Sequence, residues 1–198
     1  MTIVSSFLTF PNTGWWMQAV RADKVILDTA EHFDKMSYRN RYRISGANNS
    51  ILLTVPLVNG RNQHTPMAEV LIHNAERWQV QHWRTLVSVY KHSPYFEHYE
   101  PELQRLFEQQ FKHLLDFNRA GIQWVLRQLK PGFIMEETSV YQKDYGDEIT
   151  DLRTQKKYAP AFKKYYQVFE DRIGFVPNLS ILDLLFSEGP ATAELLSS

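Results

Sequence analysis

The 198-residue sequence contains no cysteine, has no net charge and has no long hydrophobic run. Without cysteine there is no disulfide scaffold, no thiolate nucleophile, no iron–sulfur cluster and no cysteine-ligated zinc. Basic and acidic side chains are equal in number, 22 of each, which argues against a nucleic-acid partner, because such partners need a basic surface. No stretch approaches the ~20 apolar residues of a membrane span, and the N-terminus lacks a secretory signal. We therefore expect a cytoplasmic protein.

Hydrophobic periodicity predicts strands on both sides of a central helical region. The predicted strands cover residues 2–10, 24–30, 38–45, 50–58, 67–73, 133–141 and 166–175. The predicted helices cover residues 15–21, 76–92 and 101–129, with a last helix from 181. Residues 46–49 predict a hairpin turn, and Pro94 and Pro101 bracket the break between two helices. Ser180 is the expected N-cap of the last helix, with Asp183 three positions further on.

This order of elements predicts an α/β or α+β fold in a single domain over residues 1–198. Its parts are a small Rossmann-like N-terminal unit, a β-hairpin region and a central helical part. The first unit lacks both the GxGxxG and the P-loop pattern, so no phosphate-binding motif is predicted. Residues 142–165 are rich in lysine and arginine and are interpreted as a mobile, solvated loop.

The sharpest local feature is the arginine-rich stretch at residues 38–44. If it is extended, Arg39, Arg41 and Arg43 lie on one face, and each guanidinium can form a bidentate pair with a carboxylate or phosphate. Two interpretations stay open: the three arginines bind an anionic ligand, or acids just upstream fold back as counter-ions. These acids are Asp28, Glu31 and Asp34.

His82 and the residues that follow it form a second candidate site. His82 falls on an apolar stripe of the predicted helix 76–92, so it is either a hydrogen-bonded core residue or a general base. Lys91 can compensate the helix dipole or bind substrate. Tyr95 and Phe96 follow in a turn, where aromatic rings suit a sugar, a base or a partner peptide.

The loop FPNTGWW at residues 10–16 is a third candidate. It follows the first predicted strand, and ligands of open α/β sheets bind at the carboxyl ends of strands. Asn12 and Trp15 are therefore candidate substrate-binding residues, although the tryptophan rings can equally pack the helix onto the sheet. The histidines show no metal-ligand spacing, so no metal site is predicted, and the cofactor is unknown.

Four segments in chain order resemble the WbqC-like family of bacterial proteins. They are SYRNRYRI (37–44), LLTVPL (52–57), HWRTLVSVYKHSPYF (82–96) and LSILDLLFSEGP (179–190). The positions that match family motifs are Asn40, Arg41, His82, Trp83, Tyr90, Pro94, Tyr95, Phe96 and Asp183. Many members open with a His-Gln-Pro loop, whereas residues 8–15 here lack the His-Gln pair, which weakens a chemical role for that loop.

The resemblance implies a role in the synthesis of bacterial surface polysaccharides. The first hypothesis is a transferase that moves an acyl, aminoacyl or related group to an activated sugar, with a small-molecule or nucleotide-sugar substrate. His82 would be its general base, Tyr90 or Tyr95 would orient the substrate, and Arg39, with its arginine neighbours and Asn40, would hold an anion. The alternative is a non-catalytic glycan- or partner-binding protein of the same pathway.

Overall fold

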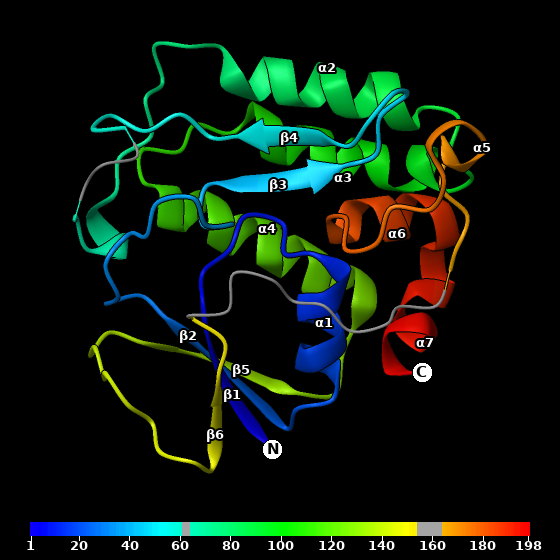
Figure 1. The fold of residues 1–198 in the computed structure, drawn as a ribbon. Coiled ribbons are helices and arrows are strands. Elements are labelled where there is room, and N and C mark those ends of the chain that lie inside the picture. Colours follow the sequence, from blue (N-terminus) through cyan, green and yellow to red (C-terminus); the bar gives the residue numbers. More distant parts are fainter. Residues whose placement is uncertain (61–63, 154–163) are drawn as a thin grey trace.

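In the computed structural model, which describes residues 1–60, 64–153 and 164–198, the first three elements form a parallel β–α–β unit (Figure 1). Strand β1 (Thr2–Ser6) runs parallel to β2 (Lys24–Asp28), and α1 (Thr13–Val20) connects them. The Asn12 side chain caps α1 by accepting the backbone N–H of Trp15 at 2.9 Å, which satisfies one of the free amides at the helix start. This confirms the predicted Rossmann-like unit.

The sheet is completed by two strands from much later in the chain. Strand β5 (Ile134–Thr138) pairs with β2, and β6 (Ile149–Asp151) pairs with β1. All pairs are parallel, and the order is β5-β2-β1-β6. The chain moves outward from β1 to β2 and β5, then returns to the other side of β1. The strand order therefore reverses at β1, and a ligand crevice is expected outside the carboxyl ends of β1 and β6.

The region between β2 and β5 holds the hairpin and the larger helices. Its elements are β3 (Arg41–Ile44), β4 (Ile51–Thr54), η1 (Met67–Glu69), α2 (Trp78–Tyr90), α3 (Phe96–Glu108) and α4 (Leu114–Leu129). The last elements are α5 (Glu170–Ile173), α6 (Ile181–Glu188), η2 (Gly189–Ala191) and α7 (Thr192–Ser197). Figure 1 shows α2 and the hairpin at one end of the molecule and the parallel sheet at the other. No helix within the described ranges is long and apolar enough to cross a membrane.

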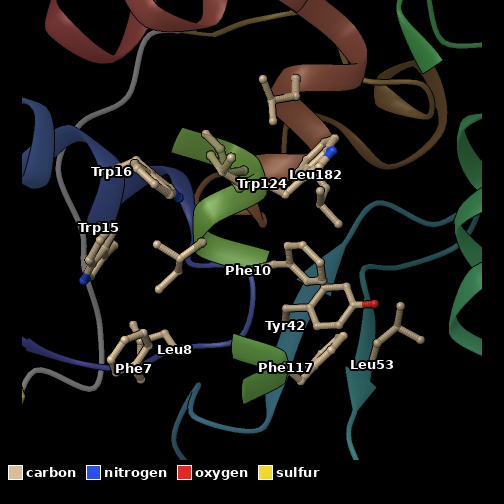
Figure 2. Packing of buried hydrophobic residues seen from close by; sticks show 14 of the residues in the cluster. Phe7, Leu8, Phe10, Trp15, Trp16, Tyr42, Leu53, Phe117, Trp124 and Leu182 are labelled. Atoms are coloured by element: carbon tan, nitrogen blue, oxygen red, sulfur yellow. The ribbon is translucent and has the colours of Figure 1, made fainter. Parts of the chain in front are cut away.

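One hydrophobic cluster joins the sheet, the hairpin and the helices. Figure 2 shows the rings of Phe10, Tyr42 and Phe117 close together, and the ring centroid of Phe10 lies 5.2 Å from that of Tyr42 and 5.9 Å from that of Phe117. Trp15 and Trp16 on α1 are fully buried. Phe10, Trp15, Trp16 and Tyr42, which the sequence places beside turns or arginines, therefore belong to the core.

The helical region differs from the predicted single helix over 101–129. Helix α3 begins at Phe96 and contains Pro101, while the break comes after Glu108. Proline removes the hydrogen bond to the carbonyl four residues earlier, and that residue, Glu97, is exposed, so water can take the place of the lost donor. In the break at 109–113 the backbone bonds to another segment, because the Lys112 carbonyl accepts the N–H of Ile72 and the Leu114 N–H donates to the Val70 carbonyl.

Two predicted strands are wrong and one strand escaped prediction. Residues 67–73 form η1 followed by isolated bridges. Residues 166–175 contain the single turn of α5. The backbone N–H and carbonyl of Val176, just after this segment, both bond the Gln167 side-chain amide at 2.9 Å and not a neighbouring strand. Strand β6 lies in the predicted loop 142–165; residues 154–163 of that loop lie outside the described residues.

Candidate functional site

A cavity of about 480 Å³ opens at the carboxyl edge of the parallel sheet. It is lined by Glu31, His32, Asp34, Arg39, Tyr141, Lys143, Asp151 and Arg153. These residues come from the segment after β2, from the approach to β3, from the loop after β5 and from the end of β6. The cavity thus lies where the reversed strand order predicts a crevice, and its volume falls in the range of small-molecule sites.

Arg153 holds the β5–β6 loop against the sheet. Its Nη1 donates to Asp28 Oδ2 at 2.7 Å and to the Gln142 carbonyl at 2.8 Å, and its Nη2 donates to Asp151 Oδ2 at 2.6 Å. Its Nε also donates to Asp151. Asp28 is fully buried, and its other oxygen accepts the backbone N–H groups of residues 30 and 31. Every nitrogen of the Arg153 guanidinium is therefore used within the protein.

Arg39 and Glu31 form a second buried ion pair. Glu31 accepts from Arg39 Nε at 3.0 Å and Nη2 at 2.6 Å, and from Ser6 Oγ at 3.0 Å. Burial raises the pKa of Glu31, and the Arg39 hydrogen bonds only partly oppose that rise. Unlike the guanidinium of Arg153, that of Arg39 does not use every nitrogen in a hydrogen bond. Its Nη1 donates no hydrogen bond within the described residues and lies 3.9 Å from Asp34 Oδ2. The Nη1–Nη2 edge of the Arg39 guanidinium therefore faces the cavity with a long ion pair to Asp34 and no hydrogen bond from Nη1 among the described residues.

The remaining lining groups offer a proton acceptor, a cation and a ring. The His32 imidazole and the Lys143 ammonium are exposed and form no side-chain hydrogen bond with any described residue. The Tyr141 ring is 52% exposed, and the Arg153 guanidinium carbon lies 5.5 Å from its centroid. An exposed ring beside polar groups is suited to stacking on a sugar.

The structure places His82 and Tyr90 in the core, away from this cavity. His82 is buried on α2; its Nδ1 lies 3.2 Å from Tyr42 Oη and its Nε2 lies 3.2 Å from the Thr54 carbonyl oxygen. A carbonyl only accepts, so Nε2 donates and Nδ1 accepts. Burial lowers the pKa of His82 to about 4. Tyr90 is fully buried and donates to Asp183 Oδ1 at 2.5 Å.

Tyr95, Phe96 and Lys91 lie near each other in the chain but do not form a common pocket. Tyr95 is 38% exposed and packs against Gly189. Phe96 is buried, with its ring centroid 5.1 Å from that of Phe186. Lys91 is exposed at the end of α2.

The other predicted binding residues make internal contacts. Trp15 Nε1 donates to Ser5 Oγ at 2.8 Å, and Asn40 Nδ2 donates to the Val55 carbonyl at 2.9 Å. Arg41 Nε donates to the Ser37 carbonyl and Arg43 Nη1 to Ser50 Oγ; Asn12 is the cap of α1. The three arginines do not form one row, because Arg39 precedes β3 and turns toward Glu31. Of the predicted residues, Arg39 alone lines the cavity.

Sequence reasoning missed His32, Tyr141, Lys143, Asp151 and Arg153 as site residues. The sequence does indicate His32 indirectly. The polar stretch DTAEHFD follows the apolar run of the predicted strand 24–30, and the sites of α/β proteins form at the carboxyl ends of strands. The predicted site at a strand end is the segment after β1, and the residues of that segment are buried. No sequence pattern indicates Asp151 and Arg153. Asp151 is the last residue of a strand of only three residues, and Arg153 follows it.

Comparison with known proteins gives one result that covers most of the chain. The sequence model of the WbqC-like protein family matches residues 8–159, a range that includes every residue lining the cavity. No curated protein and no solved structure matches the chain.

Proposed function

The chain belongs to the WbqC-like protein family, and we propose that it is an enzyme of bacterial surface-polysaccharide synthesis whose substrate site is the cavity at the carboxyl edge of the sheet. The reaction is the transfer of an acyl, aminoacyl or related group to an activated sugar. The observation that carries this proposal is that one cavity is lined by the exposed His32 imidazole and by the Arg39 guanidinium, whose Nη1 donates no hydrogen bond among the described residues. The pathway rests on the family resemblance.

The cavity residues supply the parts that group transfer requires. His32 takes the proton from the attacking hydroxyl or amine of the sugar as that atom bonds to the acyl carbon, and returns it to the leaving group when the old bond breaks. The Nη1–Nη2 edge of Arg39 holds an anionic group of the substrate. Tyr141 offers a ring face to the sugar. The general-base role moves from His82 to His32, because both ring nitrogens of His82 are bonded in the core.

One observation favours the alternative, a protein that binds glycan without turnover. The buried carboxylates of Asp28 and Glu31 are each bonded to an arginine, and the partly buried Asp151 bonds Arg153 as well. They offer no free carboxylate for proton transfer, and Asp34, the remaining acid of the lining, is ion-paired with Arg39. In this cavity the proposed proton transfer therefore depends on His32. The two functions therefore separate on a single residue.

The test begins with thermal-shift screening against nucleotide sugars, ATP, acyl-CoA and amino acids, followed by turnover measurements with the ligands that bind. A ligand at 100-fold its Kd adds roughly 2.7 kcal/mol to the free energy of unfolding. We expect His32→Gln to lower turnover by about 10²–10⁴-fold with no change in Tm. His92→Gln is the matched control, since His92 is exposed and outside the cavity. Binding without turnover in the unaltered protein would instead establish the binding function.

A further inference from the structure

The N-terminus of α1 is the place where a β–α–β unit of this kind ordinarily holds a diphosphate, on free backbone amides. Here the protein itself occupies those amides. Thr13 N–H donates to the Leu179 carbonyl at 3.0 Å, Gly14 N–H to Asn178 Oδ1 at 2.9 Å, and Trp15 N–H to Asn12 Oδ1 at 2.9 Å. Thr13 and Gly14 are also buried. A diphosphate has no place to bind at this helix.

The cavity lacks the positive charge that a diphosphate would need. Its acidic lining residues, Glu31, Asp34 and Asp151, balance its basic ones, Arg39, Lys143 and Arg153. The buried Asp28 carboxylate behind Arg153 adds one more negative charge. A ligand that brings several negative charges would be left without compensation as it loses water.

An anion with a single negative charge is the least costly one in such a cavity, and Arg39 is the cation that can receive it in place of its long, 3.9 Å ion pair with Asp34. Arg39 uses Nε and one Nη2 hydrogen on Glu31, which leaves the edge formed by Nη1 and the second Nη2 hydrogen. Two parallel N–H groups on one guanidinium edge match two oxygens of a carboxylate or phosphate. The Arg39 side chain is only 6% exposed, so this edge is preorganised. Lys143 and His32 are the other lining groups with unused donors.

We propose that the cavity recognises its ligand by a single carboxylate, bound at the Nη1–Nη2 edge of Arg39 in competition with Asp34 and with Lys143 and His32 beside it, and that it does not hold a nucleoside diphosphate. The inference rests on the proposed function only in taking this cavity as the substrate site. An activated sugar would then enter by its sugar ring, with its diphosphate outside the cavity.

The test is a calorimetric titration of the full chain with four probes: glucuronate, glucose 6-phosphate, glucose and UDP. Glucuronate brings one negative charge, whereas glucose 6-phosphate brings about two. We expect glucuronate to bind ten-fold more tightly than glucose, glucose 6-phosphate and UDP. Lys143→Gln should weaken that binding several-fold, whereas Lys35→Gln, an exposed lysine of the Asp34 loop outside the cavity, should leave it unchanged.

The proposal is overturned if UDP or glucose 6-phosphate binds as tightly as glucuronate, if glucuronate binds no more tightly than glucose, or if Lys143→Gln and Lys35→Gln behave alike. Its failure is distinguishable from that of the proposed function, because the titrations measure binding alone. Carboxylate binding without turnover removes the transferase function and keeps this inference. Turnover with a ligand that has no carboxylate does the reverse.

Discussion

Replacing Arg39 with methionine is expected to lower the free energy of unfolding by about 3–5 kcal/mol, the range found when one partner of a buried ion pair is removed. Methionine keeps much of the arginine's apolar volume, so the loss reports mainly on charge. Without Arg39, the Glu31 carboxylate keeps one hydrogen bond from Ser6 and no cation bonded to it among the described residues. Denaturant unfolding at pH 7 measures the effect.

Two companion variants decide whether the buried charge is the cause. Arg41→Met should cost no more than ~1 kcal/mol, because Arg41 is half-buried and bonds only a backbone carbonyl. Arg39→Met combined with Glu31→Gln should recover part of the stability, since the second change removes the unpaired charge. Equal losses in Arg39→Met and Arg41→Met would contradict the role assigned to the pair.

His82 and Asp183 should give opposite pH dependences of stability, each about 3 kcal/mol in size at ~1.36 kcal/mol per pKa unit. Burial lowers the pKa of His82 from 6.5 to about 4, so its contribution is complete above pH 6.5 and is lost as pH falls toward 4. Burial raises the pKa of Asp183 from 3.8 to about 6, against hydrogen bonds from Tyr90 and Tyr165. Its contribution is complete below pH 3.8 and is lost as pH rises through 6.

The two slopes nearly cancel in the unaltered protein, so single substitutions are needed to reveal them. The destabilisation caused by His82→Gln should be larger at pH 7 than at pH 4 by about 3 kcal/mol. The destabilisation caused by Asp183→Asn should be larger at pH 4 than at pH 7 by a similar amount. Denaturant unfolding of both variants and the parent chain between pH 4 and 7 provides the measurement. Parallel curves for the two variants would show that these groups do not titrate as their burial requires.

The N-terminal unit and the hairpin could be predicted because their patterns are local. The predicted strand 24–30 contains the short continuous apolar run Val-Ile-Leu of a buried strand, and residues 46–49 carry the turn chemistry of a hairpin. Ser180 marks the start of α6, and its Oγ accepts the Leu182 N–H as a cap does. The start of α3 could not be predicted in this way, because Pro101 is tolerated only where the carbonyl of Glu97 faces water.

The candidate site depends on contacts that no local pattern contains. Strand β6 has three residues, and its partner β1 lies at the other end of the chain, so neither alternation nor length identifies it. The arginine-rich stretch does predict part of the site, and the acids upstream of it are predicted as possible counter-ions. Glu31 and Asp34 do face Arg39, but Asp28 pairs with Arg153, which only the sheet order brings near.

The bond between Arg153 and Asp28 also has a consequence for the order in which the molecule is completed. The two residues are separated by 125 positions, and contacts of such long range form late, after shorter loops have closed. During synthesis from the N-terminus, a nascent chain can form the β–α–β unit and the hairpin while Asp28 still lacks its cation. The cavity gains Asp151 and Arg153 only when β6 joins the sheet, so we expect the proposed ligand binding only once the chain has been synthesised beyond Arg153.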